Sequence, residues 1–528
     1  MPEELREPWL AMAAEDPIVC DHSRRLMQVM RLPPGCPAQT AYYGCYENER
    51  YAILNRHVVD VGSYSKRAVK LMWRVMRSVL PTTTVTRWSE QQFVDHCKGA
   101  KRRRYANAFA SLRVLGLNDD DARIRAFIKF EKSDRSKAAV KAPRLIQYRD
   151  PRFCGTLGCY LAPLERMLFG RWNLRDGVEH AVFSKGLDSY QIAKRIVHMD
   201  RFADTVFVLA DAKNFDSHMV YQWRQLLHRY YLQSCRGGAE LRWLLRKQLV
   251  NYGLTANGVK YSCQARMMSG EYDTSLGDTL VNYTLLKAWL GTVDHEILIN
   301  GDDSVIAVSR SDLPKLELPY AYSRHAKYKL PMVDWFQLHA FEVVVEMVEG
   351  LESVEFCQAH PVQVRPGVWR MVRKPIRALS RMSYSIHNYA GESWLRYLTA
   401  VGLAELALSD GVPVLQAAAQ RCLTYGRGKK PIDLPDYHPG QLERGYGCAK
   451  PQQITAQARA SFAVAFDMSP TEQINLENWL LRDDGSFLEG LSSKRIESVF
   501  KINLFGLRRG WRPKHNARED ACEEDEPE

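Results

Sequence analysis

The chain has 528 residues, 46% hydrophobic and 25% charged, which is enough apolar sequence for a substantial core and excludes a wholly disordered chain. Its length fits one large multi-lobed enzyme or two to three ordinary domains. The 73 lysines and arginines outnumber the 61 aspartates and glutamates, so the net charge is +12. This surplus favours a polyanionic partner such as nucleic acid, although a basic protein without that function fits the charge about equally well.

The cysteines and the apolar runs indicate in which kind of compartment the protein folds and whether it crosses a membrane. Twelve cysteines occur without a CxxC pair or zinc-ligand spacing, which indicates free thiols in a reducing compartment. The N-terminal segment lacks the basic and apolar regions of a signal peptide. The most apolar stretch, 400–420, contains Glu405, Asp410 and Pro413 and predicts two helices of a water-soluble domain. We therefore expect no transmembrane segment in this sequence.

A basic stretch at 127–153 is the first segment whose residues suggest a binding or catalytic role. Lysines and arginines alternate there with short apolar runs, and they include Lys129, Lys132, Lys141 and Arg144. Such a set would neutralise a triphosphate and draw charge from a leaving pyrophosphate. Taken alone, the segment is more often a solvated charged loop.

The apolar run VFVLAD at 206–211 predicts a buried strand that ends at Asp211, and Asp216 follows in DAKNFD. A carboxylate at the end of a buried strand is costly unless it binds a cation. A lone aspartate after a strand is more often a helix cap. Further along, Asn257-Gly258 predicts the turn of a β-hairpin.

The segment SGEYDTSLGDT at 269–279 joins a predicted strand to a predicted helix. Ser269 and Gly270 would let the backbone approach a ligand closely, because glycine has no side chain. Thr274 and Asp278, four residues apart, share one helical face. An ordinary capped helix is the simpler interpretation of this segment in isolation.

Two β-forming runs flank Gly301-Asp302-Asp303 in EILINGDDSVIAV, which predicts a hairpin with carboxylates at its tip. A strand-end aspartate beside such a pair supplies the hard oxygen ligands of a two-metal site, in which Mg²⁺ ions lie about 3.5–4 Å apart. Gly-Asp-Asp alone is also simply a good turn. The four signals together, in this order, are much more specific than any one of them.

In this order the segments resemble the motifs of RNA-dependent RNA polymerases from tombus-like positive-strand RNA viruses. DAKNFDSH is similar to motif A, MMSGEYDTSLGDT to motif B and GDD to motif C. LESVEFCQAHPV at 351–362 is similar to motif E, and the basic stretch at 127–153 to motif F. Weaker similarity at 41–58 and 458–477 extends the match over most of the chain.

The resemblance implies an α+β right-hand polymerase fold of fingers, palm and thumb, with an antiparallel palm sheet that carries the GDD hairpin. It also implies a division of the chain along its length. The expected parts are an N-terminal extension and fingertips at 1–125, fingers with the basic motif at 126–205, palm with motif A at 206–225, fingers at 226–262, palm with motifs B, C and D at 263–355, motif E and thumb at 356–510, and an acidic, disordered tail at 511–528.

The resemblance also assigns roles to individual residues. The catalytic metal ligands, for Mg²⁺ or Mn²⁺, would be Asp211, Asp302 and Asp303. Asp216 would contact the ribose 2′-hydroxyl of the incoming nucleotide, with Asp278 beside it. The triphosphate would be bound by Lys129, Lys132 and Arg144, and the template and nucleotide would be held by Ser269, Gly270 and Thr274.

Two positions depart from the pattern of these polymerases. Asp278 stands where motif B usually has asparagine, and an ionised aspartate accepts hydrogen bonds but donates none. The segment 339–350, where motif D would lie, has no lysine to protonate pyrophosphate. His339, Lys327 or Lys329 would be the substitutes, unless no residue takes that role.

The sequence thus predicts a viral RNA-directed RNA polymerase that replicates and transcribes a positive-strand RNA genome from ribonucleoside triphosphates, with primer-independent or template-end initiation. Its partners would be template and product RNA and viral or host factors that recruit it to membranes. Its location would be the host cytoplasm, at membrane-associated replication sites. Two alternatives remain: a non-catalytic viral RNA-binding protein, which needs no acidic hairpin tip, and a reverse transcriptase, which usually has an aromatic residue two positions before the aspartate pair. A P-loop NTPase is disfavoured because the sequence has no GxxxxGK[ST] motif.

Overall fold

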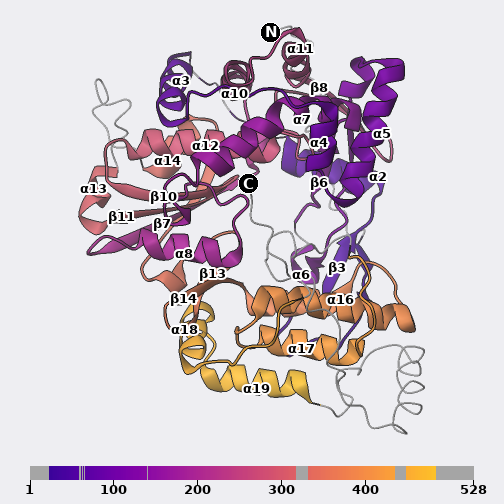
Figure 1. Ribbon diagram of the computed structural model, residues 1–528, viewed down its shortest axis with the longest axis vertical. Coiled ribbons are helices and arrows are strands. Elements are labelled where there is room, and N and C mark those ends of the chain that lie inside the picture. The colour runs from indigo at the N-terminus through magenta and orange to yellow at the C-terminus, as the bar shows by residue number, and fades with distance from the viewer. Residues whose placement is uncertain are drawn as a thin grey trace.

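A computed structural model describes residues 23–434 and 448–482, except 59–60, 62–63, 65, 139–140 and 317–330. Helices surround several small sheets, and the last described helices form one end of the molecule (Figure 1). The mixture of helices with mainly antiparallel sheets confirms the α+β class. The predicted acidic tail at 511–528, Lys327 and Lys329 lie outside the described residues.

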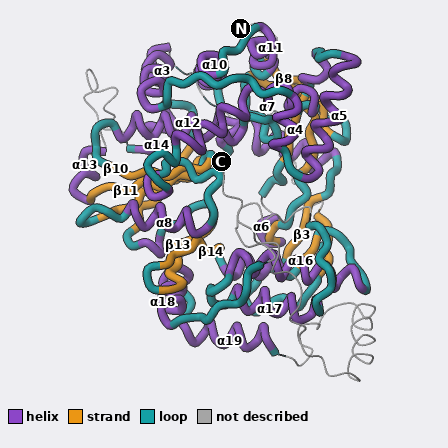
Figure 2. Tube along the Cα trace, in the orientation of Figure 1, coloured by secondary structure: helices purple, strands orange, loops and turns teal. Residues whose placement is uncertain are grey.

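The central sheet has four antiparallel strands in the order β10 (His295–Asn300), β11 (Asp303–Ser309), β7 (Thr205–Lys213) and β12 (Glu342–Val348). Alternate side chains of β7 enter two different cores, because neighbouring residues of a strand point to opposite faces. Val208 and Ala210 pack with α12 (Thr274–Leu290) and α14 (Met332–Leu338), whereas Phe207 and Leu209 pack with α8 (Ser189–Met199). Figure 2 shows these strands between the helices of the two layers.

A second four-stranded sheet has the order β6 (Leu145–Tyr148), β4 (Ile124–Ile128), β8 (Val250–Thr255) and β9 (Lys260–Gln264). Strands β8 and β9 pair antiparallel around Asn257 and Gly258, which confirms the predicted hairpin. One face of this sheet packs on the N-terminal region through a core that includes Tyr42 and Ile53. The smaller sheets contain β1 (Ser23–Arg25), β3 (Gln39–Tyr42) and β5 (Ser133–Asp134); β2 (Met27–Gln28) and β15 (Tyr384–Ser385); and β13 (Ala359–Arg365) and β14 (Val368–Arg373).

Helices cover the upper part of the molecule in the view of Figure 1. Local signals start several of them: Asp150 accepts a hydrogen bond from the Arg152 amide, and Pro151 occupies the first helical position. The helices before the GDD segment, besides α8 and α12, are α2 (Tyr46–Ala52), α3 (Lys66–Val79), α4 (Glu90–His96), α5 (Gly99–Leu115), α6 (Arg135–Ala138), α7 (Pro151–Arg166), α9 (Phe215–His218), α10 (Tyr221–Ser234) and α11 (Ala239–Lys247), and α13 (Leu313–Leu316) follows it.

The C-terminal helices share a separate core with the N-terminal strand β2. They are α15 (Pro375–Met382), α16 (Glu392–Ser409), α17 (Leu415–Gly426), α18 (Ala456–Phe466) and α19 (Pro470–Leu481). The stretch at 400–420 belongs to two helices that break at Asp410, as predicted. Within the described ranges, none of the helices has the length and low polarity that crossing a bilayer requires.

Candidate active site

Three carboxylates meet at one edge of the central sheet. Asp211 on β7 lies directly opposite Asp303 on β11, and Asn300 opposite Asp303 leaves Gly301 and Asp302 as the turn. Opposed residues of antiparallel strands have Cα atoms about 4.5–5.5 Å apart. All three aspartates line one cavity of about 840 Å³. The register of two strands therefore brings together residues that are about ninety positions apart in the chain.

Helix α12 fixes the turn that carries Asp302. The Asn282 side-chain amide donates hydrogen bonds to the carbonyl oxygens of Gly301 (3.0 Å) and Asp302 (3.2 Å). The Thr279 hydroxyl accepts a hydrogen bond from the Gly301 amide at 3.0 Å. These contacts satisfy the polar backbone of a tight turn, and they hold it in one place. The sequence analysis did not identify Asn282 or Thr279, although their i, i+3 spacing places both on one helical face.

The environment of these carboxylates disfavours negative charge. Burial raises the pKa of Asp302, and Asp211 raises it further. Burial, together with Asp302 and Asp211, raises the pKa of Asp303 to about 6. In the described part of the chain, none of the three forms an ion pair with lysine or arginine. Partly buried carboxylates whose nearby cations, here Lys141 and Arg144, do not form direct ion pairs with them are suited to hard divalent cations.

The three carboxylates fit a metal site by their chemistry, but the described side chains do not surround a common point as a finished set of ligands.

The predicted basic residues Lys129, Lys132 and Arg144 line the same cavity as the three aspartates. Lys129 follows β4 and Arg144 precedes β6, and the Lys129 amide donates to the Arg144 carbonyl at 2.7 Å. Both side chains approach the Glu131 carboxylate, at 3.0 Å and 3.6 Å respectively. The Lys132 ammonium donates to the Arg381 carbonyl at 2.8 Å. Residues of the basic motif and of the GDD turn thus line one cavity.

Further cations line this cavity that the sequence analysis did not assign to it. Lys141 and Lys137 belong to the basic stretch at 127–153, but neither was among the residues assigned to the triphosphate by the resemblance; the others are Arg56, Arg377 and Arg381. Arg377 and Arg381 are four residues apart on α15, so they lie on one face of that helix. This spacing was the available signal, but only the fold shows that α15 lies beside the basic motif.

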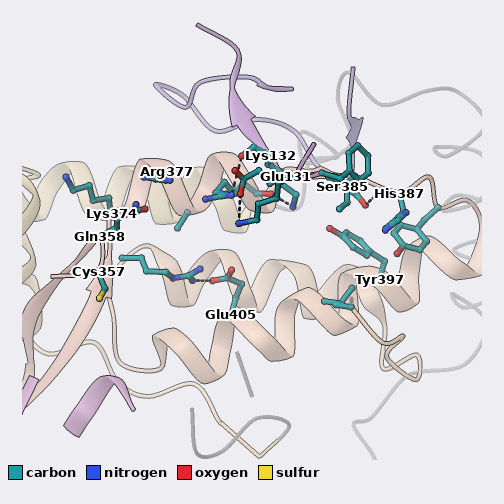
Figure 3. A pocket seen from close by; sticks show the side chains of 18 residues that line it. Glu131, Lys132, Cys357, Gln358, Lys374, Arg377, Ser385, His387, Tyr397 and Glu405 are labelled. Atoms are coloured by element: carbon teal, nitrogen blue, oxygen red, sulfur yellow. Dashed lines mark hydrogen bonds and ion pairs between the residues drawn. The ribbon is translucent and has the colours of Figure 1, made fainter. Parts of the chain in front are cut away.

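A second cavity of about 440 Å³ shares Lys129, Lys132, Arg377 and Arg381 with the first (Figure 3). Arg373, at the end of β14, continues the row of arginines at the same four-residue spacing. Like charge from Arg377 and Arg373, in addition to burial, lowers the pKa of Arg381. The far end of this cavity is aromatic, and is lined by Phe130, His387, Tyr389 and Tyr397.

Asp216 and Asp278 form a hydrogen bond between their carboxyl groups. Burial raises the pKa of Asp216 to about 6, and the hydrogen bond with Asp278 lowers it. Burial and the charge of Asp216 raise the pKa of Asp278 well above its ordinary value. Of the two carboxyl groups, Asp278 is the one whose charged form is disfavoured more strongly. Asp278 Oδ1 is buried and has no hydrogen-bond partner in the described structure.

The Ser269-Gly270 loop lies against β6. The Gly270 amide donates to the Gln147 carbonyl at 2.7 Å, and a Cβ atom at Gly270 would lie only 2.7 Å from that oxygen. The Ser269 hydroxyl donates to the Leu145 carbonyl at 3.2 Å. The close approach predicted for this glycine is thus an approach to another strand of the chain. Thr274 Oγ1 donates to the Met268 carbonyl at 2.8 Å, and these three residues do not line either cavity.

A buried ionic network holds the same loop from behind. Arg149 pairs with Glu271, and Arg224 pairs with Glu271 at 3.2 Å and with Asp273 at 3.1 Å. All four side chains are almost inaccessible to solvent. Removing one member would leave buried charge uncompensated, so the network makes the loop rigid. Sequence reasoning missed it because its members come from distant segments.

His339 does not reach the site. It is fully buried against Trp335 and Trp223, its Nδ1 lies 2.7 Å from the Tyr64 hydroxyl, and burial lowers its pKa to about 3. His339 does not line either cavity, so its ring is not placed beside a bound triphosphate. The hypothesis that His339 replaces the motif D lysine is therefore not supported by its position.

Comparison with known proteins adds an independent line of evidence. Residues 48–482 match the family model described as viral RNA dependent RNA polymerase. The chain is 31% identical to the RNA-directed RNA polymerase of Oat chlorotic stunt virus (isolate United Kingdom) over 427 residues, which cover 76% of this chain and 54% of that protein. It is 32% identical to the polymerase of Tobacco necrosis virus (strain D), over 76% of this chain and 55% of the relative. It is also 32% identical to that of Tomato bushy stunt virus (strain Cherry), over 74% and 47% respectively.

The match covers most of this sequence, but the chain spans only about half the length of these curated relatives. The family model matches from before the basic motif to beyond motif E, so the similarity includes both the basic motif and the GDD segment that line the cavity. The chain belongs to the family of viral RNA-dependent RNA polymerases, which have the right-hand polymerase fold.

Proposed function

We propose that this chain catalyses RNA-directed RNA synthesis, by nucleotidyl transfer from ribonucleoside triphosphates, and that it thereby replicates and transcribes a positive-strand RNA genome. The observation that carries the proposal is the shared cavity, which is lined by Asp211, Asp302 and Asp303 and also by Lys129 and Arg144. Nucleotidyl transfer needs both kinds of group, because an attacking hydroxyl must lose a proton while negative charge builds up on pyrophosphate.

Asp211 and Asp302 would be the principal ligands of Mg²⁺, with Asp303 in support and Mn²⁺ as a substitute. Divalent cations at this position would lower the pKa of the attacking 3′-hydroxyl and neutralise charge on the leaving group. The contacts of Asn282 with the turn would keep Asp302 in place when its charge is engaged.

Lys129, Lys132 and Arg144 would bind the triphosphate. Lys129 and Arg144 now share the Glu131 carboxylate, so an entering phosphate would exchange with it. Glu131 would thus keep the cations oriented in the absence of nucleotide. Phosphate is the stronger partner because it carries more charge and accepts bidentate hydrogen bonds from a guanidinium group.

Asp216 and Asp278 would recognise the ribose of the incoming nucleotide. Because its pKa is raised, Asp278 would be protonated at neutral pH, and it would then resemble asparagine in shape and in its ability to donate a hydrogen bond. Its unpartnered Oδ1 would pair with the 2′-hydroxyl, and a deoxyribonucleotide would leave this buried atom unsatisfied. Ser269, Gly270 and Thr274 would position template and nucleotide by fixing the loop before α12.

The adjoining cavity supports primer-independent initiation. The first nucleotide of such a product keeps its triphosphate, so two triphosphates must be bound at once. Arg377 and Arg381 line both cavities and would supply the second set of phosphate contacts. The aromatic end of the second cavity offers flat surfaces for a base.

The division into fingers, palm and thumb at the boundaries predicted from the sequence stays part of this proposal. The proposal also includes the host cytoplasm as the location, and viral or host factors that would bring the enzyme to membranes.

A direct test is primer extension by the purified chain on an RNA template, with Mg²⁺ and either ribonucleotides or deoxyribonucleotides. The proposal expects template-dependent extension with ribonucleotides and little with deoxyribonucleotides. Preferred use of deoxyribonucleotides would indicate a reverse transcriptase. RNA binding without extension, in the presence of either metal, would indicate the non-catalytic alternative.

A further inference from the structure

The outward face of the β6-β4-β8-β9 sheet carries a combination of side chains that the catalytic site does not use. One row crosses all four strands in register: Tyr148 faces Arg125, Arg125 faces Leu254, and Leu254 faces Lys260. A neighbouring row contains Phe127, whose ring lies 5.8 Å from that of Tyr148 in an edge contact. Tyr252 lies on the same face of β8, two residues from Leu254.

This face is open to solvent although its residues are large and apolar. Tyr252 is 60% exposed, Leu254 49% and Phe127 41%. The opposite face of the same strands is buried in the core that includes Ile124 and Tyr261. Exposed apolar side chains that lie in contiguous rows, rather than singly, mark a binding surface.

The charge of this face indicates which kind of partner it would bind. The four strands contain no aspartate or glutamate, and Arg125 and Lys260 project into solvent among the apolar side chains. Arg123, at the end of the sheet, pairs with the Asp120 carboxylate at 3.1 Å and is already partly neutralised. Exposed rings interleaved with cations suit bases and phosphates of an unpaired nucleic-acid strand, since every base has a π-face.

The position of the face connects it with the catalytic cavity. Lys129 directly follows β4 and Arg144 directly precedes β6, and both line that cavity. Phe127 therefore lies two residues from the cavity wall, and Arg125 lies about 7 Å further along the strand. A strand of RNA that crosses the Tyr252 and Tyr148 region and then Phe127 would arrive beside the basic motif.

The scaffold under this face is rigid. The Asn257 side chain, in the turn between β8 and β9, donates to the Gly44 carbonyl at 3.0 Å and to Glu49 at 2.9 Å. Gly270 packs against β6 so closely that its amide bonds the Gln147 carbonyl. A preformed surface loses little conformational entropy on binding, so its aromatic side chains contribute efficiently to affinity.

We propose that this face, defined by Arg125, Phe127, Tyr148, Tyr252, Leu254 and Lys260, is a stacking platform for single-stranded template RNA before it enters the catalytic cavity. This inference rests on the proposed polymerase function and adds to it the path of the unpaired template.

The test uses the whole chain and a fluorescein-labelled uridine oligonucleotide that is too short to fold. Tyr252→Leu keeps apolar bulk but removes the aromatic ring, so we expect the dissociation constant to rise about tenfold. Tyr252→Phe keeps the ring and should bind like the wild type. Arg125→Gln should reduce the slope of log affinity against log salt by about 0.7. A 4-thiouridine in the same RNA should cross-link to a peptide that contains Tyr252.

Equal binding by wild type and Tyr252→Leu, together with no cross-link to β8, would overturn the platform. Loss of binding in Tyr252→Phe as well as Tyr252→Leu would also count against stacking. Both results are separate from the proposed function, which is measured by ribonucleotide incorporation in the wild-type chain. An active wild type with an unaffected Tyr252→Leu variant refutes the platform alone, whereas an inactive wild type refutes the polymerase assignment.

Discussion

The buried carboxyl groups of Asp216 and Asp278 lie within hydrogen-bonding reach of each other, and burial together with the charge of Asp216 raises the pKa of Asp278 well above its ordinary value. Asp216 lies in α9, directly after β7, and Asp278 in the first turns of α12. We expect Asp278 to be protonated at neutral pH, and a protonated aspartate donates a hydrogen bond as asparagine does.

Asp278→Asn should therefore be active and more stable than the wild type at neutral pH. Burial and the charge of Asp216 raise the pKa of Asp278 well above that of an unfolded aspartate, so above about pH 4 the native state binds more protons through this group. The stability that Asp278 contributes therefore falls as pH rises from about 4 through its raised pKa. Asp278→Asn should flatten the fall and gain roughly 1 kcal/mol at pH 7.5, as measured by urea unfolding at several pH values. An unchanged pH profile would show that the pKa of Asp278 is not raised.

Asp216→Ala should lose discrimination against deoxyribonucleotides. The ratio of kcat/KM for a ribonucleotide to that for its deoxy analogue should fall about tenfold or more, because the polar group that rewards the 2′-hydroxyl is gone. Asp278→Asn should keep the ratio within a few-fold of wild type and serves as the control. If Asp216→Ala retains the wild-type ratio, another residue reads the sugar.

Asp211→Ala and Asp302→Ala should each abolish RNA synthesis with little change in thermal stability, because each removes a metal ligand and not core packing. Asp176→Ala, which removes an exposed carboxylate that pairs with its neighbour Arg175, is the matched control and should be active. Incorporation of labelled nucleotide is the measurement. Activity above a few per cent of wild type in either site variant would contradict the assignment.

Asn282→Ala should reduce kcat about tenfold while nucleotide KM changes little. The substitution removes two hydrogen bonds to the GDD turn but no group that faces the cavity. A positioning role predicts that raised Mg²⁺ concentration restores part of the rate, because a displaced ligand binds metal more weakly. Loss of activity that tracks a large drop in melting temperature would indicate a merely structural role.

Substitutions of Arg144 and Arg377 should have different effects, because the two residues would bind different triphosphates. Arg144→Ala should raise the KM for nucleotides about tenfold in both primed and unprimed reactions, since a bidentate phosphate contact is lost. Arg377→Ala should impair unprimed synthesis much more than extension of an annealed primer, because only initiation needs a second triphosphate.

Arg102→Ala removes an exposed arginine of α5 that pairs with Asp95, and should leave both reactions unchanged. Equal losses in primed and unprimed synthesis for Arg377→Ala would refute the second triphosphate site.

Much of the local structure could be predicted from the sequence. The β-forming runs before Asp211 and around Gly301 predicted the strands, Asn257-Gly258 predicted the β8–β9 turn, and Ser469 starts α19 with the reciprocal hydrogen bonds expected of a capping box. These features depend on neighbouring residues only, through backbone preference and local hydrogen bonds. The order of motifs likewise predicted the family, because that order is a property of the chain.

Only the tertiary structure decided which residues meet. The antiparallel register of β7 and β11 places Asp211 opposite Asp303, and the packing of α12 on the central sheet brings Asn282 to the GDD turn. The row of Arg377 and Arg381 became part of the cavity because α15 lies against the basic motif. The sequence determined the chemistry of each segment; long-range strand pairing and helix packing, whose partners are far apart in the chain, determined the site.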